Sequence, residues 1–153
     1  MNATSVSTLV KREGTDAIIK WLQAKNSKEE WPRVVERFKL SLAAYCVSTY
    51  VFGTANYDKL MVSGIGQVFQ NDLTIVPSVH ERKLFKLTPE ISKMIGSPGQ
   101  TSFIEFTSLA KKAYNILRKN SAVFVTAFDV VSTSLHLIWS SLKLKSHIFA
   151  WKR

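Results

Sequence analysis

A nearly unbroken apolar segment over residues 42–52 is the feature that most constrains the fold of this chain. It ends at Gly53 and continues a pattern in which apolar side chains recur at helical spacing: Val34, Val35, Phe38, Leu42, Tyr45 and Cys46. A helix whose end is apolar all round is usually buried on most of its sides. We therefore predict a central helix up to about Tyr50, with Cys46 as a small core residue.

A short polar loop separates this helix from a predicted β-hairpin. Leu60–Val62 and Gln67–Phe69 have the composition of two short strands, and the glycine-containing segment Ser63–Gly66 supplies the turn between them. The two glycines of that segment lie between strands and not before a helix, so we interpret them as a turn and not as a phosphate-binding loop. Asp72 follows the second strand closely.

The remaining segments favour helices, which gives an α+β, mainly α-helical fold class. Two starts are open for the central helix: a capping box formed by Ser27 and Glu30, or Pro32 at the first helical position. Residues 1–14 show no clear period and are expected to be irregular. Further helices are expected over residues 16–24, 89–95 after Thr88-Pro89-Glu90, 102–120 after a Ser102–Glu105 capping box, and 122–142.

The last of these segments is also about as long as the roughly 20 residues of a membrane span. Asp129 lies well inside it and would cost about 2.5–3.5 kcal/mol near the bilayer centre. Several hydroxyl-bearing residues dilute the segment further. We therefore favour a buried core helix over a membrane span.

Composition narrows the class of protein. A length of 153 residues suits one domain, and a single cysteine excludes an intrachain disulfide and a cysteine-based zinc site. The net charge of +10 is compatible with a phosphate-bearing partner, but the basic residues form no long run, so a solvated surface is the simpler interpretation. We expect no nucleic-acid partner. The polar N-terminus lacks a signal peptide's apolar core, which favours a cytoplasmic location.

Several collinear segments resemble the C-lobe of the class I phosphoinositide 3-kinases. The central match is Ala44–Gly53, and it is followed by Asp58–Val62 and Gly66–Phe69. Further matching segments are Ile19–Asn26, Val35–Phe38, Glu81–Arg82, Phe85–Thr88 and Ala113–Asn120. The resemblance implies a partial catalytic domain of the PI3/PI4-kinase family over residues 1–133, with a protein-kinase-like C-lobe, a small hairpin and no N-lobe. Residues 134–153 are then a divergent basic and aromatic tail.

The resemblance also implies roles for single positions, and several of them carry the wrong chemistry. The family's catalytic loop reads D-R-H-x-x-N, and Thr54, Asn56 and Lys59 stand at its aspartate, histidine and metal-binding asparagine. A threonine cannot accept a proton as a carboxylate does, and a protonated lysine cannot ligate Mg²⁺. Asp72 keeps the metal-binding aspartate of the family's D-F-G motif. Met61 and Phe69 correspond to the floor of its ATP cleft.

These departures lead us to expect a phosphatidylinositol 3-kinase-like catalytic-domain fragment that is a catalytically inactive pseudokinase. It would act as an interaction module or be a relic, and a protein partner would cover the exposed cleft floor around Met61 and Phe69. ATP and Mg²⁺ are implied by the family resemblance alone, and we expect no cofactor here. We expect no kinase activity from the chain by itself.

Two alternative functions remain open at this point. The first is a lipid kinase that phosphorylates the inositol 3-hydroxyl with ATP when another chain supplies the N-lobe. The second is a helical adaptor or an anionic-lipid-binding protein for which the resemblance covers only the scaffold. The basic and aromatic tail, with Phe149, Trp151, Lys152 and Arg153, would then contact anionic membrane lipids peripherally. A frayed or packed terminus is the simpler interpretation of the same tail.

Overall fold

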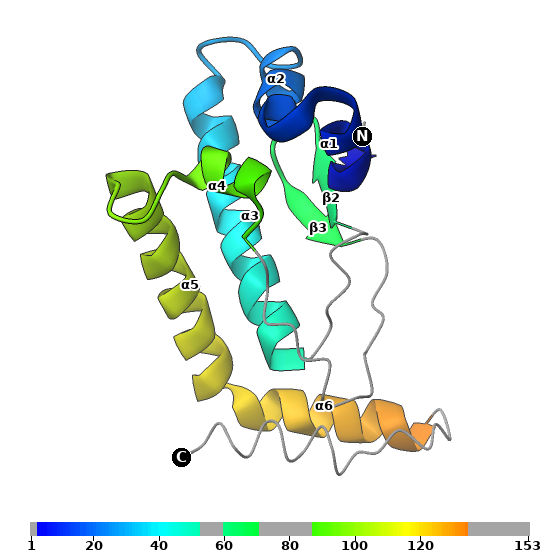
Figure 1. Cartoon of the computed structure of the whole chain (residues 1–153). Helices are drawn as coiled ribbons and strands as arrows, with labels where there is room; N and C mark the ends of the chain where they lie inside the picture. Colours follow the sequence, from blue (N-terminus) through cyan, green and yellow to red (C-terminus); the bar gives the residue numbers. More distant parts are fainter. Residues whose placement is uncertain (1–2, 53–59, 71–86, 135–153) are drawn as a thin grey trace. The chain divides into compact units, whose positions relative to one another are not determined.

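The computed structural model describes residues 3–52, 60–70 and 87–134, without the side chains of residues 131–134 (Figure 1). The described residues form a mainly helical α+β fold with one small sheet, as the sequence predicts. The elements are β1 (Ala3–Ser5), α1 (Val6–Glu13), the 3₁₀ turn η1 (Gly14–Asp16), α2 (Ala17–Gln23), α3 (Trp31–Phe52), β2 (Leu60–Ser63), β3 (Val68–Gln70), α4 (Pro89–Ile95), α5 (Thr101–Lys119) and α6 (Ser121–Ser134). Residues 1–110 and 111–153 form two compact units, and each is considered separately below.

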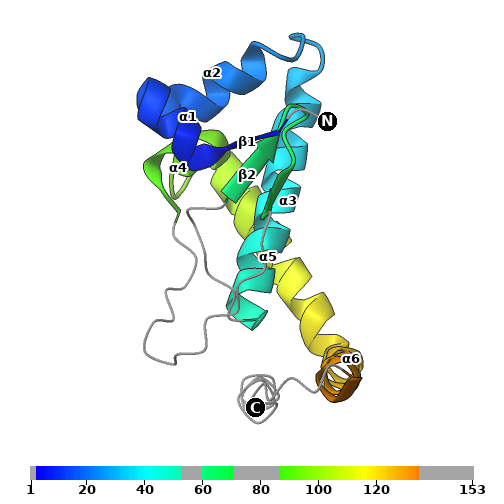
Figure 2. The same ribbon diagram turned by 90° about the vertical axis from the view of Figure 1, so that its right-hand side faces the viewer.

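The sheet is antiparallel, with its strands in the order β1-β2-β3. The predicted hairpin is confirmed as β2 and β3, with Val62 opposite Val68. The third strand was not expected, because residues 3–5 were predicted to be irregular. Thr4 lies opposite Val62, so β1 runs along the free edge of β2 (Figure 2). The helix α1, which follows β1, was not expected either, because residues 1–14 were predicted to be irregular.

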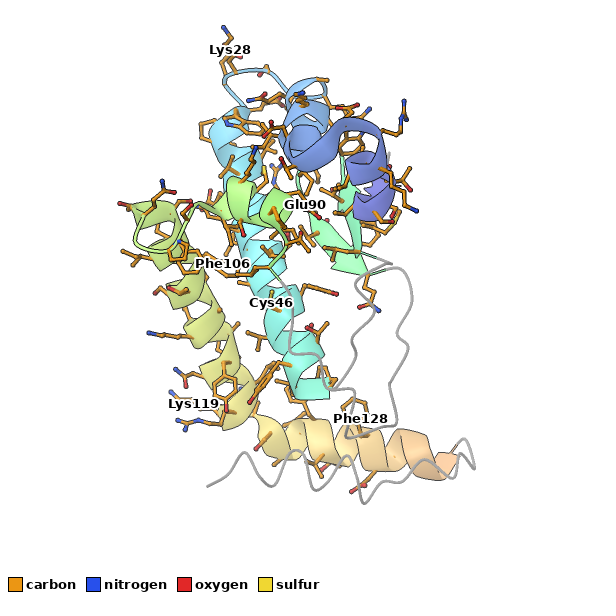
Figure 3. The ribbon with its side chains drawn as sticks, in the orientation of Figure 1. Lys28, Cys46, Glu90, Phe106, Lys119 and Phe128 are labelled. Atoms are coloured by element: carbon orange, nitrogen blue, oxygen red, sulfur yellow. The ribbon has the colours of Figure 1, made fainter. Side chains whose placement is uncertain are left out.

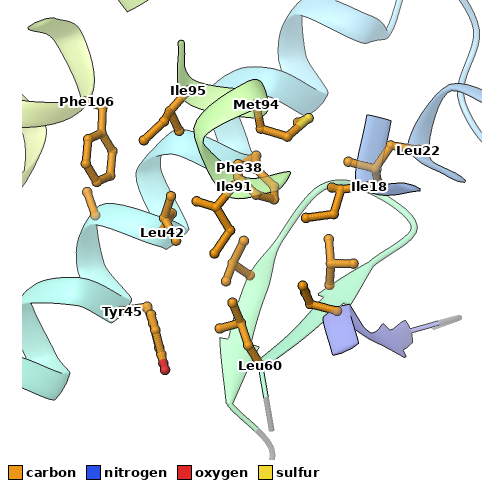
Figure 4. Packing of buried hydrophobic residues seen from close by; sticks show 14 of the residues in the cluster. Ile18, Leu22, Phe38, Leu42, Tyr45, Leu60, Ile91, Met94, Ile95 and Phe106 are labelled. Atoms are coloured by element: carbon orange, nitrogen blue, oxygen red, sulfur yellow. The ribbon is translucent and has the colours of Figure 1, made fainter. Parts of the chain in front are cut away.

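One face of the sheet closes the hydrophobic core of the first unit, which centres on α3 (Figure 4). Burial of this core is the main driving force for folding of the unit. Cys46 is 2% exposed, which confirms its prediction as a core residue. The buried residues come from every layer around α3: Ile18 and Leu22 of α2, Phe38 and Leu42 of α3, Leu60, Val62 and Val68 of the sheet, Ile91, Met94 and Ile95 of α4, and Phe106 of α5.

Both proposed starts of the central helix contribute to the observed one. The Ser27 N–H donates to Glu30 Oε2 at 3.1 Å, and the Glu30 N–H donates to Ser27 Oγ at 3.3 Å, which is a reciprocal capping box. The regular helix then begins at Trp31, one residue before Pro32. The second proposed box differs, because Ser102 lies inside the first turn of α5 and Glu105 pairs with Lys39 at 2.5 Å.

The helix predicted over residues 122–142 is described only as far as Ser134, where α6 ends. Ser121 is buried, but the following side chains up to Val130 are half-buried or exposed, in contrast to the predicted core helix. Among the residues that the structure describes, no helix is both long enough and apolar enough to cross a membrane.

Candidate functional site

Met61 and Phe69, the two predicted cleft-floor residues, are direct partners across the β2–β3 hairpin. Both side chains are half-buried. Successive side chains of a strand point to opposite faces, so Met61 and Phe69 lie on the face opposite Leu60, Val62 and Val68, which enter the core. The other predicted site residues, Thr54, Asn56, Lys59 and Asp72, lie outside the described residues.

Ser5 of β1 extends this pair into a row across the sheet. It lies opposite Met61, so Ser5, Met61 and Phe69 occupy neighbouring positions on all three strands. Sequence reasoning did not find Ser5, because Ala3–Ser5 has no apolar alternation that would indicate a strand. We call the three residues the hairpin row. A thioether beside an aromatic ring offers a polarizable apolar surface for packing, and none of the three side chains is an acid or a base near neutral pH.

A hydroxyl group of the central helix fixes the position of β3. The Val68 N–H donates to Ser41 Oγ at 2.8 Å, and the same hydroxyl donates to the Arg37 carbonyl oxygen at 2.6 Å. Ser41 therefore satisfies one backbone donor of a strand that would otherwise face the helix unpaired. This contact fixes the position along α3 at which β3 packs.

The turn of the hairpin is held from two sides. The Asn26 side-chain amide donates to the carbonyl oxygens of Leu22 and Gly64, each at 2.8 Å. Gly66 has a φ of +85°, and a β-carbon at this position would lie 2.6 Å from the carbonyl oxygen of Val34. Only glycine combines this backbone conformation with so close an approach to α3. The segment is therefore a turn between strands, as predicted.

Cys46 and Asp16 are two described residues of the first unit whose pKa values are shifted. Burial raises the pKa of the Cys46 thiol to about 12, so the nucleophilic thiolate is scarce at neutral pH. Asp16 has a lowered pKa because it accepts a hydrogen bond from Lys93, and this pair is exposed. Within residues 3–52, 60–70 and 87–134, no cluster of three histidine, cysteine or acidic side chains is placed to hold a metal ion.

Comparison with known proteins gives one consistent relationship. Residues 3–141 match the family model described as phosphatidylinositol 3- and 4-kinase. The chain is 34% identical over 125 residues to phosphatidylinositol 3-kinase 3 of Dictyostelium discoideum. This alignment covers 74% of this chain and 7% of that protein.

Two further relatives show the same pattern. Phosphatidylinositol 3-kinase 1 of Dictyostelium discoideum is 31% identical over 155 residues, or 88% of this chain and 10% of that protein. Phosphatidylinositol 3-kinase VPS34 of Saccharomyces cerevisiae is 31% identical over 106 residues, or 66% of this chain and 12% of that protein. The chain thus spans about a tenth of the length of the relatives that it matches.

Proposed function

Because the chain belongs to the phosphatidylinositol 3- and 4-kinase family, we propose that it retains the scaffold of a kinase C-lobe but acts as a catalytically inactive interaction module. The observation that carries the proposal is the contrast between two neighbouring parts of the chain. The hairpin that bears Met61 and Phe69 is formed and packed against the core. The segment before it carries Thr54, Asn56 and Lys59 where the family has its catalytic and metal-binding residues.

The packing of the hairpin supports a retained scaffold. Ser41 and Asn26 make side-chain hydrogen bonds to its backbone, and Val62 and Val68 are buried in the core cluster that also contains residues of α3. A segment under no structural constraint need not carry glycine where a β-carbon would lie 2.6 Å from a backbone carbonyl oxygen, as it would at Gly66. These features position the hairpin row whether or not phosphate chemistry takes place.

The side chains of the preceding loop argue against phosphoryl transfer. This reaction depends on positioning and charge stabilisation, so each missing group lowers the rate. In the resemblance, threonine replaces the catalytic carboxylate, and a cationic lysine replaces a metal ligand at Lys59. Asp72 alone is a weak donor set for Mg²⁺. The residues of this chain therefore do not fit a Mg²⁺–nucleotide complex, and we derive no step through one.

The hairpin row suits a protein partner better than it suits catalysis. Met61 and Phe69 present an apolar pair on the face of the sheet away from the core. Apolar side chains of this kind are frequent anchors at protein interfaces. We propose that a partner packs an apolar side chain against Met61 and Phe69.

A kinase assay tests the loss of catalysis. The full chain is incubated with phosphatidylinositol vesicles, labelled ATP and Mg²⁺, and the Asp72→Asn variant is run beside it. We expect no labelled lipid from the chain above the level of the variant. Turnover that Asp72→Asn abolishes would overturn the proposal and favour an active lipid kinase.

Site-specific photo-crosslinking tests the interaction. A photoreactive residue at position 69 is expected to yield a discrete adduct in cells. The same residue at position 40, where Leu40 is 46% exposed on α3, is expected to yield none. Adducts of equal amount at both positions would mean that the hairpin row is not a binding surface.

A further inference from the structure

The α6 helix carries an exposed apolar face. Val123, Ala127 and Val130 are spaced four and three residues apart, so they share one side of the helix, and all three are exposed. Val123 is 67% exposed and Val130 is 59% exposed. The half-buried Phe128 lies on the other side of the helix (Figure 3). We call Val123, Ala127 and Val130 the α6 apolar face.

The helix that leads into α6 is basic at its C-terminal end. Lys111, Lys112, Arg118 and Lys119 of α5 are all exposed, and Ile116, which lies among them, is 53% exposed. Arg118 and Lys119 end α5 two residues before α6 begins (Figure 3). Residues 106–128 contain no acidic side chain that would neutralise these cations. We call the four lysines and arginines the α5 basic group.

The charge of the chain is concentrated in the same unit. Residues 111–153 contain eight lysines and arginines and one acidic residue, Asp129, so they carry most of the net charge of +10. Asp129 is half-buried, and its position on the helix puts it at the border of the α6 apolar face. An unbalanced positive charge of this kind attracts anionic surfaces and repels cationic ones.

From these features we propose that α6 and the end of α5 dock onto the surface of an anionic lipid bilayer. The α6 apolar face would enter the boundary between headgroups and acyl chains, which is how amphipathic interfacial helices bind. Arg118 and Lys119 would extend their aliphatic stems along that boundary and place their charges among lipid phosphates.

Position along α5 decides which cations matter most. Lys111 lies eight residues before Lys119, which corresponds to roughly 12 Å along a helix axis. The Debye length at physiological ionic strength is about 8 Å, so screening weakens the pull on Lys111 and Lys112 more than on Arg118 and Lys119. We therefore expect the two cations next to α6 to contribute most to binding.

Other occupants of this surface fit less well. A second copy of the chain would bring an identical basic group to the interface, and the like charges would repel. The phosphates of a nucleic acid would pair with the cations, but its bases would make no specific contact with the exposed valines, since single strands bind by stacking on aromatic side chains. The proposal goes beyond the interaction at the hairpin row, because it uses neither Met61 and Phe69 nor the loop before them.

Vesicle co-sedimentation with the full chain tests the docking. Vesicles of phosphatidylcholine alone are compared with vesicles that also contain about 30% phosphatidylserine, at low and high salt. We expect binding to the anionic vesicles that weakens with salt, and little binding to the neutral ones. Each lysine or arginine near such a surface contributes about fivefold in affinity, so Arg118→Gln/Lys119→Gln is expected to weaken binding roughly 25-fold.

Two matched variants separate this mechanism from general attraction. Lys11→Gln/Arg12→Gln removes two exposed cations from α1, and Leu40→Gln removes an exposed apolar residue from α3. Both are expected to bind within about threefold of the parent chain. Val123→Gln/Val130→Gln is expected to lose at least tenfold, because it removes the inserted apolar face. All of these positions are exposed, so the fold is expected to persist, and circular dichroism checks it.

Three outcomes would overturn the proposal. Equal weakening by the α1 and α5 charge variants would mean attraction to the whole basic chain. Unchanged binding of Val123→Gln/Val130→Gln would mean that no apolar face enters the lipid. The third outcome is that the parent chain is a dimer on sizing chromatography and Val123→Gln/Val130→Gln is a monomer with unchanged vesicle binding. This result would assign the α6 apolar face to a second copy.

Discussion

Asn26 and Gly64 are 38 positions apart in the sequence, and the Asn26 side-chain amide joins them by a 2.8 Å hydrogen bond to the Gly64 carbonyl oxygen. The same amide donates to the Leu22 carbonyl oxygen. One side chain thereby ties the end of α2 to the turn of the hairpin.

Removal of this amide is expected to destabilise the protein. Asn26→Ala removes the donor to the partly buried Gly64 carbonyl oxygen, whereas the Leu22 carbonyl oxygen keeps the Lys25 N–H. We expect the free energy of unfolding to fall by about 1–3 kcal/mol. Asn120→Ala is the matched control, because the Asn120 amide donates to one exposed carbonyl oxygen, that of Ile116 in the preceding helix α5. Urea denaturation measures both, and a loss of equal size in the two variants would contradict a cross-linking role for Asn26.

Substitution of the turn glycine should cost more than backbone conformation alone. Gly66→Ala places a β-carbon 2.6 Å from the Val34 carbonyl oxygen at a φ of +85°, whereas Gly99, at a φ of +93°, has nothing within 4 Å of the corresponding position. We expect Gly99→Ala to cost about 1–2 kcal/mol from the left-handed backbone, and Gly66→Ala a further 1–3 kcal/mol or so from the clash. Thermal unfolding of the two variants side by side separates these contributions.

The Cys46 thiol should make stability fall at high pH. Burial raises its pKa to about 12 in the folded protein, whereas an unfolded thiol titrates near about 8.5–9. Between those values the unfolded chain has lost a proton that the folded chain keeps, so stability decreases as pH rises. From pH 7 to pH 9.5 we expect a loss of about 1 kcal/mol from this group.

Cys46→Ala isolates this contribution from those of the lysines and tyrosines. The variant is expected to be less stable at pH 7, because it loses buried volume, but its stability should fall less between pH 7 and pH 9.5. Parallel slopes for the two proteins in urea titrations would be inconsistent with a buried, protonated thiol.

Lys59 stands where the family's catalytic loop has its metal-binding asparagine, so it is expected to oppose metal binding. Lys59→Asn removes a cation and supplies a carbonyl oxygen of the kind that Mg²⁺ accepts. We expect this variant to gain Mg²⁺-dependent thermal stabilisation by ATP, about 1 kcal/mol or roughly 3 °C at a nucleotide concentration fivefold above the dissociation constant.

The parent chain is expected to show no such shift. Lys28→Asn makes the same charge change at an exposed position before α3 and should behave as the parent does. A shift in Lys28→Asn as large as that in Lys59→Asn would show that net charge, and not position 59, controls binding.

The parts of the fold that the sequence predicted are those set by local pattern. The hairpin followed from two short apolar runs around a glycine turn, and its register brought Met61 and Phe69 together. The central helix followed from its apolar spacing. In α1, Val6, Leu9 and Val10 are spaced three and four residues apart, so a signal for that helix was present in the segment expected to be irregular.

Other features depend on partners that are distant in the sequence. The three residues of β1 form a strand because β2 offers them an open edge, and nothing within Ala3–Ser5 indicates it. Ser41 is equally unremarkable as a polar residue within a helix until β3 packs against it. Glu105 has the spacing of a capping residue, but Lys39 of α3 provides a stronger, charged partner.

The burial of Cys46 provides a built-in reporter of unfolding. It is the only cysteine of the chain, and it is 2% exposed within α3. A thiol reagent can reach it only after α3 has separated from its neighbours, so each modified molecule records one opening of the core. The rate of modification in the native state therefore measures how often the core opens, without any label having to be introduced.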